Sequence, residues 1–93
     1  MPISVGKRQI RIKRYGNFSL VKEVTLETSK VKVRDIILEA VERKNLGQSI
    51  TEWLEGSSNS PYIIIADKKT VELDESLDED VKEIELRPVI GGG

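Results

Sequence analysis

The stretch "SKVKVRDIILEAVERKNLG" at positions 29–47 carries the clearest structural pattern in the chain. Apolar residues recur in it at intervals of three and four, which places them on one side of an α-helix. Asp35 near the start and Arg43 near the end suit the helix dipole, Glu39 and Arg43 are spaced for an ion pair, and Gly47 offers a left-handed stop. The sequence therefore predicts one amphipathic helix, whose buried stripe is Val33, Ile36, Ile37, Ala40 and Val41.

The residues before this helix alternate between apolar and polar types, as half-buried strands do. "RQIRIKR" at positions 8–14 places Ile10 and Ile12 on one face of a strand. A second strand, "LVKEVTLE" at positions 20–27, follows a turn that contains Gly16 and Asn17, two residues that tolerate positive φ. The two strands are therefore expected to form a hairpin.

The residues after the helix predict a short helical turn around Ile50–Leu54 and a mobile loop, "EGSSNSP". Trp53 is interpreted as an apolar ring at the end of the core, in preference to a binding residue. "YIIIA" at positions 62–66 has the composition of a strand inside a sheet. A short strand is expected at Thr70–Leu73, and the last strand is expected to begin at Glu83, with its apolar side formed by Val81, Ile84 and Leu86.

This order of elements predicts an α+β domain in which the helix packs on one face of a mixed sheet of four to five strands. The first and last long strands are expected side by side in the middle, with the hairpin partner and the third strand outside them. That arrangement is the β-grasp. We expect a single domain over residues 1–93, with a flexible glycine tail at residues 89–93.

Composition limits the chemistry that this chain can perform. It has neither cysteine nor histidine, so a thiolate nucleophile, an imidazole base and the usual zinc ligands are missing, and we expect no intrinsic enzyme activity. The net charge of −1 does not favour nucleic acid as a partner. No apolar run is long enough for a signal peptide or a membrane span, so a cytoplasmic location is predicted.

Two charged clusters remain open to interpretation. The acidic segment "LDESLDED" lacks the glycine and the spacing of a calcium loop, so we expect no metal site and assign Asp78 and Asp80 to surface charge. Residues 6–8 with Arg11, Lys13 and Arg14 form a basic patch in the sequence. This patch is either an exposed strand face or a docking surface for an acidic partner.

The helix "VKVRDIILEAVERKN", the strand "YIIIAD" and the ending "TVELDESLDEDVKEIELRPVIGGG" together resemble the ubiquitin-like sulfur carriers and protein modifiers. This family includes the molybdopterin-synthase small subunit, the sulfur carrier of thiazole synthesis, the ubiquitin-related modifier and the small archaeal modifier proteins. The resemblance covers roughly residues 8–93 and implies a ubiquitin-like β-grasp.

The resemblance implies that a ubiquitin-activating-type enzyme adenylates the terminal carboxylate, using its own ATP and magnesium, while this chain binds no cofactor. The activated carboxylate then becomes a thiocarboxylate for a sulfur-accepting synthase, or an isopeptide bond to a lysine of a target protein. Glycine suits such a tail because it has no Cβ to obstruct a narrow tunnel. The residues implied to dock on the activating enzyme are Arg87, Val89, Ile90, Gly91 and Gly92, and Gly93 is the residue implied to be activated.

The family usually ends in two glycines, whereas this chain ends in three. Either Gly93 reacts directly, or it is trimmed and Gly92 becomes the reactive end. Sulfur carrier, covalent modifier and a β-grasp interaction module that never uses its glycines all stay open at this point.

The helix stripe yields a first prediction. Ile37→Asp should unfold the domain, because it places a charge where roughly 1.5–3 kcal/mol of apolar burial is expected. Circular dichroism measures the outcome, and a normal spectrum for this variant would contradict the core assignment.

Overall fold

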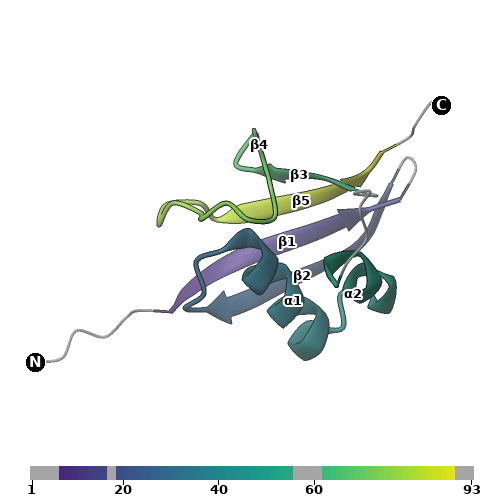
Figure 1. The fold of residues 1–93 in the computed structure, drawn as a ribbon, viewed down its shortest axis with the longest axis horizontal. Coiled ribbons are helices and arrows are strands. Elements are labelled where there is room, and N and C mark those ends of the chain that lie inside the picture. The colour runs from purple at the N-terminus through teal and green to yellow at the C-terminus, as the bar shows by residue number, and fades with distance from the viewer. Residues whose placement is uncertain (1–6, 17–18, 56–61, 90–93) are drawn as a thin grey trace, which may run out of the picture.

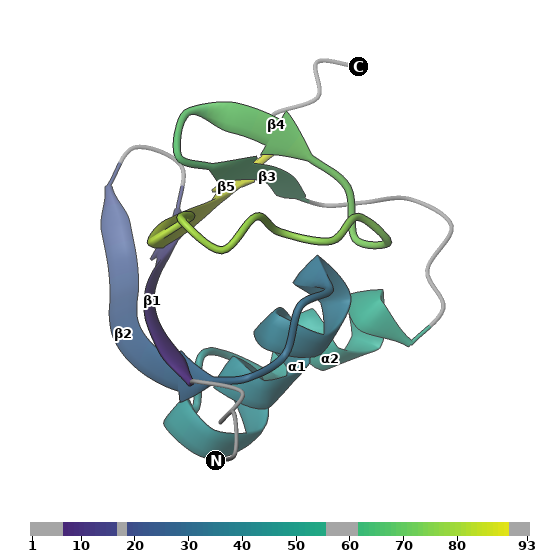
Figure 2. The same ribbon diagram turned by 90° about the vertical axis from the view of Figure 1, so that its left-hand side faces the viewer.

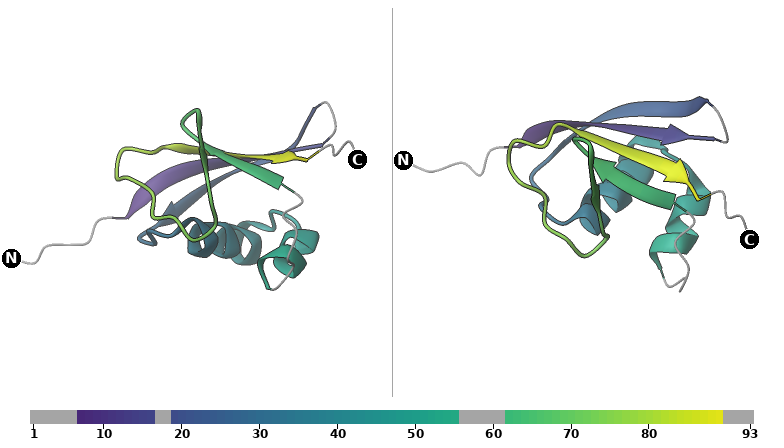
Figure 3. Two further views of the ribbon diagram at one scale, coloured as in Figure 1. Left: turned by 45° about the horizontal axis from the view of Figure 1, so that its top comes forward. Right: turned by 90° about the horizontal axis from the view of Figure 1, so that it is seen from above.

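The computed structural model describes residues 7–16, 19–55 and 62–89. Within these residues the chain forms a mixed sheet with two helices on one of its faces (Figures 1 and 3). The elements are β1 (Arg8–Tyr15), β2 (Leu20–Thr28), α1 (Val33–Lys44), α2 (Gln48–Leu54), β3 (Tyr62–Ala66), β4 (Lys69–Val71) and β5 (Glu83–Pro88). The face of the sheet opposite the helices is called the open face below.

The strand order is β2-β1-β5-β3-β4, with β1 and β5 parallel and the other neighbouring pairs antiparallel. The first and last long strands therefore lie side by side in the middle, as predicted. Viewed from its end, the sheet curves around α1 (Figure 2). The result is a small α+β fold with a mixed five-stranded sheet and one main helix, compatible with a β-grasp.

The core forms where the central strands meet α1. Ile10 and Ile12 of β1 and Ile84 and Leu86 of β5 have no exposed surface. They pack against a helix stripe that is also fully buried and consists of Val33, Ile36, Ile37 and Ala40. Val41 is only half-buried, so the predicted stripe is confirmed in four of its five residues.

The predicted end of α1 is wrong by two residues. Asn45 follows the last helical residue and adopts the left-handed conformation, with φ 56° and ψ 49°. Asparagine tolerates this conformation better than most residues, because its side chain bonds locally. Gly47 instead precedes α2, with φ 149°, and lies against the side chain of Arg14.

The later elements largely follow the predicted pattern. α2 is a full short helix rather than a single turn, and Trp53 is buried with its ring centroid 5.4 Å from that of Tyr62, which confirms its core role. β5 begins at Glu83, as predicted. β4 begins one residue earlier than predicted, because Asp67 and Lys68 both have positive φ and form a two-residue hairpin turn, and it ends at Val71 instead of Leu73. The loop expected to be mobile falls largely on residues 56–61, which lie outside the described residues.

The acidic segment before β5 closes the N-terminal end of α1. The backbone N–H groups of Val33 and Arg34 donate to the carbonyl oxygens of Glu75 and Leu73, each at 2.9 Å. Leu77 is buried and donates to Val31 at 2.8 Å. The bonds from Val33 and Arg34 satisfy two helix N–H groups that no side-chain cap satisfies, and the Leu77 bond fixes the segment beside the start of α1. The segment therefore has a structural role, because its backbone binds the start of α1. Its residues Asp78 and Asp80 are exposed, as expected.

Among the described residues, no helix is long and apolar enough to cross a membrane. The same part of the chain contains no group of three or more Asp or Glu residues placed to hold a metal ion.

One polar contact joins β2 to α1 at the edge of the core. Thr28 is buried and donates its hydroxyl to a carboxylate oxygen of Glu39 at 2.5 Å, and Arg43 binds the other oxygen at 2.8 Å. The Thr28 hydrogen bond, with smaller contributions from Arg43 and Lys30, lowers the pKa of Glu39 despite opposing desolvation. The predicted ion pair between Glu39 and Arg43 is confirmed.

This contact predicts a pH-dependent stability. Because folding lowers the pKa of Glu39, its contribution is present above the ordinary pKa and is lost as the pH falls through the folded pKa. Thr28→Val should reduce the free energy of unfolding at pH 7 by about 1.5 kcal/mol, and the deficit should shrink at about pH 3. Urea unfolding measures both, with Thr25→Val as the matched control on the exposed side of the same strand. A deficit independent of pH would contradict this role of Thr28.

Candidate functional site at the C-terminal end of the sheet

The described structure contains two of the predicted docking residues. Arg87 is the penultimate residue of β5, and Val89 follows its last residue; both are exposed. Ile90, Gly91, Gly92 and Gly93 lie outside the described residues, so their predicted roles stay predictions. The structure does define the point from which the chain runs on to these residues, which is the end of β5.

β5 is paired with β1 as far as Leu86 and with β3 as far as its last residue, Pro88. Leu86 is the register partner of Arg14 in parallel β1, and Pro88 is the register partner of Tyr62 in antiparallel β3. Pro88 has no backbone N–H with which to extend a ladder, which suits the last position of a strand. The chain therefore leaves the sheet from its central strand, beside the end of β1 (Figure 1).

The guanidinium of Arg87 lies on the open face over the ring of Tyr15. Its Cζ atom is 4.1 Å from the ring centroid, within the range of a cation–π contact. Its Nε atom also donates to a carboxylate oxygen of Glu85 at 2.9 Å. These two contacts hold an exposed arginine in one orientation next to the end of β5.

Apolar side chains surround this arginine. Ile63 is the register partner of Arg87, and Leu20 is the register partner of Tyr15. Of the five large apolar residues exposed among the described residues, four lie at this end of the sheet, and the exception is Val31 before α1. We define the C-terminal patch as Tyr15, Leu20, Val21, Ile63, Arg87 and Val89. A cluster of exposed apolar residues around a held arginine is typical of a protein-binding surface.

The charges on the rest of the open face are largely satisfied within the chain. Arg11 lies 3.2 Å from a carboxylate oxygen of Glu23, and Lys13 lies 3.3 Å from one of Glu83. Arg11 also approaches Glu83 at 4.0 Å. Such exposed pairs add little stability, but they leave less free charge to attract a partner.

The basic patch expected from the sequence is therefore wrong as a single docking surface. Strand alternation places Arg11 and Lys13 on the open face and Arg14 on the helix face, next to the core residue Leu86. Arg8 donates to the backbone carbonyl of Asp78. The sequence run of cations is divided between two faces, and the carboxylates that neutralise Arg11 and Lys13 come from other strands.

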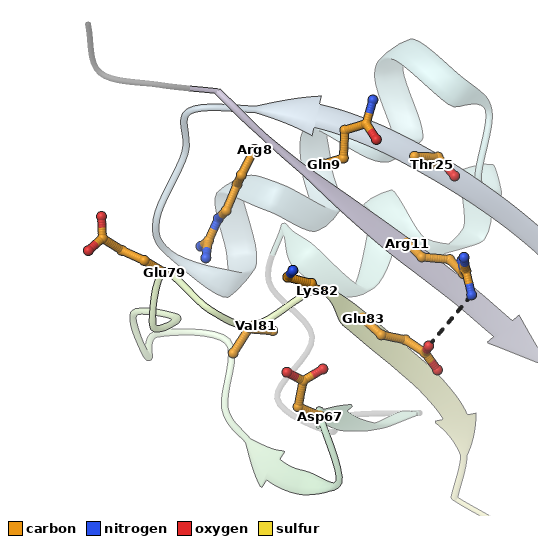
Figure 4. A pocket seen from close by; sticks show the side chains of 9 residues that line it. All are labelled: Arg8, Gln9, Arg11, Thr25, Asp67, Glu79, Val81, Lys82 and Glu83. Atoms are coloured by element: carbon orange, nitrogen blue, oxygen red, sulfur yellow. Dashed lines mark ion pairs between the residues drawn. The ribbon is translucent and has the colours of Figure 1, made fainter. Parts of the chain in front are cut away.

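A hollow of about 810 Å³ lies at the other end of β5 (Figure 4). Figure 4 shows its lining side chains coming from β1, β2, the β3–β4 turn, the segment before β5 and the start of β5, with one ion pair between Arg11 and Glu83. Arg8, Arg11 and Lys82 face an equal number of carboxylates, from Asp67, Glu79 and Glu83. Because its charges are balanced and it lies away from the end of β5 from which the chain continues to its last residues, this hollow is a weaker candidate than the C-terminal patch.

The sequence analysis missed the roles of Tyr15, Leu20, Val21 and Ile63 in the patch. The available signal was the pairing of the last strand with "YIIIA", since an antiparallel register places alternate isoleucines on the open face.

Comparison of this chain with protein-family models, with curated proteins and with solved structures gave no match.

The held arginine yields a measurable coupling. In a double-mutant cycle, Tyr15→Leu and Arg87→Gln should show a coupling of about 0.5–1 kcal/mol in the free energy of unfolding, because each change removes one partner of the cation–π contact. Urea unfolding of the two single variants and the double variant gives the value. Tyr15→Leu combined with Arg43→Gln on α1 is the control pair, and a coupling no larger than in this control would contradict the contact.

Proposed function

We propose that this chain is a ubiquitin-like β-grasp carrier, whose C-terminal glycine carboxylate is adenylated by a ubiquitin-activating-type enzyme and then used as a sulfur carrier or a protein modifier. The observation that carries the proposal is the exit of the C-terminal segment from the central strand, directly beside the exposed C-terminal patch. The resemblance of the helix, the acidic turn and the glycine ending to that family supports it. A cytoplasmic location belongs to the same proposal.

The length of the tail explains why the patch would take part. Val89 and Gly93 are four residues apart, so a fully extended chain separates them by at most about 14 Å. An enzyme that acts on the terminal carboxylate must therefore approach the end of β5 closely. Ile63, Val21 and the held Arg87 lie on the surface that such an enzyme would cover.

The chemistry requires no catalytic group from this chain. The terminal carboxylate oxygen attacks the α-phosphorus of ATP, forming an acyl-adenylate and releasing pyrophosphate. Hydrosulfide then attacks the acyl carbon and AMP leaves, which gives the thiocarboxylate directly. Where the donor is a persulfide, a second thiol reduces the resulting acyl disulfide, which releases the thiocarboxylate and leaves a disulfide. In the modifier branch a partner thiolate forms a thioester, and a lysine amine displaces it to give an isopeptide bond. Glycine contributes an unhindered carbonyl carbon to each step.

A second candidate is a β-grasp interaction module that never uses its glycines. The C-terminal patch favours it as well, because an exposed apolar surface can bind a partner without covalent chemistry. The two candidates differ in what happens to the terminal carboxylate.

The test is chain-dependent exchange of pyrophosphate into ATP by the activating enzyme of the same host. The full chain should support exchange, and a chain lacking Gly92 and Gly93 should not, while its circular dichroism stays normal, because a terminal tail contributes little to stability. Ile63→Asp should weaken activation at least tenfold, since docking would lose about 1.5 kcal/mol of apolar burial. Val31→Asp is the matched control, with 51% exposure against 43% for Ile63.

Intact mass spectrometry after addition of a sulfur donor separates the branches. Replacement of one oxygen by sulfur identifies the carrier, larger discrete adducts identify the modifier, and fragmentation of the last peptide shows whether Gly92 or Gly93 reacts. Exchange that persists in the shortened chain would refute the terminal-carboxylate mechanism. An unmodified full chain that still binds a partner through Ile63 would favour the interaction module.

A further inference from the structure

Arg14 occupies an unusual position on the helix face of the sheet. It continues the core-facing series of β1 and is half-buried beside Leu86. Its Nε atom donates to the Tyr62 hydroxyl at 3.4 Å, and its Nη1 atom donates to the Leu46 carbonyl at 3.3 Å. Both distances exceed the usual range for such bonds, and neither acceptor carries a charge. The guanidinium is therefore positioned but not neutralised.

Arg14 differs in this respect from most other arginines of the described chain. Arg11, Arg34, Arg43 and Arg87 each form an ion pair with an aspartate or a glutamate. Arg14 forms none with any described residue, and neither does its half-buried register partner Lys22. Two cations on neighbouring strands therefore lie on the helix face, and neither forms an ion pair with a described carboxylate. A partly buried charge is costly unless an opposite charge accompanies it.

Gly47 leaves the space that this guanidinium occupies. A Cβ atom at position 47 would lie 2.6 Å from Nη1 and 3.2 Å from Cζ of Arg14. The backbone at Gly47, which has no side chain, therefore lies against the guanidinium of Arg14. A guanidinium has five N–H donors, and the two observed bonds use two of them.

We propose that Arg14 and Lys22 form a receptor for the carboxylate of an acidic side chain presented by a protein partner. A planar carboxylate accepts two parallel bonds from one guanidinium, and Lys22, the register partner of Arg14 on β2, adds a second positive charge. The receptor lies on the helix face, whereas Arg87 of the C-terminal patch lies on the open face. It therefore does not depend on the reaction proposed for the terminal glycine.

The receptor is tested by titrating the ¹⁵N-labelled full chain with a hexaglutamate peptide that is acetylated and amidated at its ends. The Nε–Hε resonance of Arg14 and the amide resonances of Leu46 and Gly47 should shift to saturation, while the Nε–Hε resonance of Arg43 should not. Arg14→Gln should weaken binding at least tenfold and Lys22→Gln about threefold, in keeping with the greater strength of the bidentate pair. Arg43→Gln, an exposed arginine on α1, is the matched control and should leave the affinity unchanged.

Arg14→Lys separates geometry from charge, because it keeps the positive charge and removes the planar fork. Its affinity should fall between those of the full chain and Arg14→Gln. Circular dichroism confirms folding of each variant, and Lys22→Gln on the edge strand β2 keeps the test decisive if Arg14→Gln does not fold.

Three results would overturn the proposal that Arg14 and Lys22 bind an acidic side chain. The first is saturation that shifts Arg87 or Arg11 without shifting Arg14. The second is an unchanged affinity in either folded variant, Arg14→Gln or Lys22→Gln. The third is displacement of the peptide by inorganic phosphate at an equal or lower concentration, which would assign the site to phosphate instead of an acidic side chain.

Discussion

The burial of the parallel pair β1 and β5 beneath α1 is the constraint on which the rest of this structure depends. Ile12, Ile84 and Leu86 are fully buried there, and strand side chains alternate between the two faces. Once these residues face the helix, Lys13 and Arg87 must face the opposite side. The packing of these residues against α1 therefore determines the core, the charged open face and the side of the sheet on which Arg87 lies.

Parallel pairing also explains how the candidate site is assembled. Parallel strands end at the same edge of a sheet, and they need a long connection between them. Here that connection contains every other element of the described chain, from β2 through α1, α2 and β3 to β4, so Tyr15 and Arg87 meet although they are far apart in the sequence. The end of the first hairpin and the end of the last strand thus form one surface.

Local patterns predicted the elements well, because strand alternation and the helix stripe reflect burial on one side. The prediction failed where the answer depended on a contact between distant segments. Gly47 was expected to end α1, but Asn45 does so, while Gly47 accommodates Arg14. The basic run was expected to form one patch, yet Glu23 and Glu83 neutralise part of it from other strands. Ile63 was recognised as a strand residue but not as a surface residue, since its face follows from its pairing with Arg87.

The three consecutive glycines at positions 91–93 have no side chains that a partner could distinguish. Under the proposed function, discrimination between partners must come from other side chains, and those on the sheet combine defined positions with different chemistry. The two faces beside Pro88 offer such side chains of different kinds. The open face presents apolar residues around Arg87, and the helix face presents Arg14 with no carboxylate of its own among the described residues. A partner that matched both would need an apolar surface and an acidic side chain on opposite sides of one strand end, and few unrelated proteins would meet that requirement.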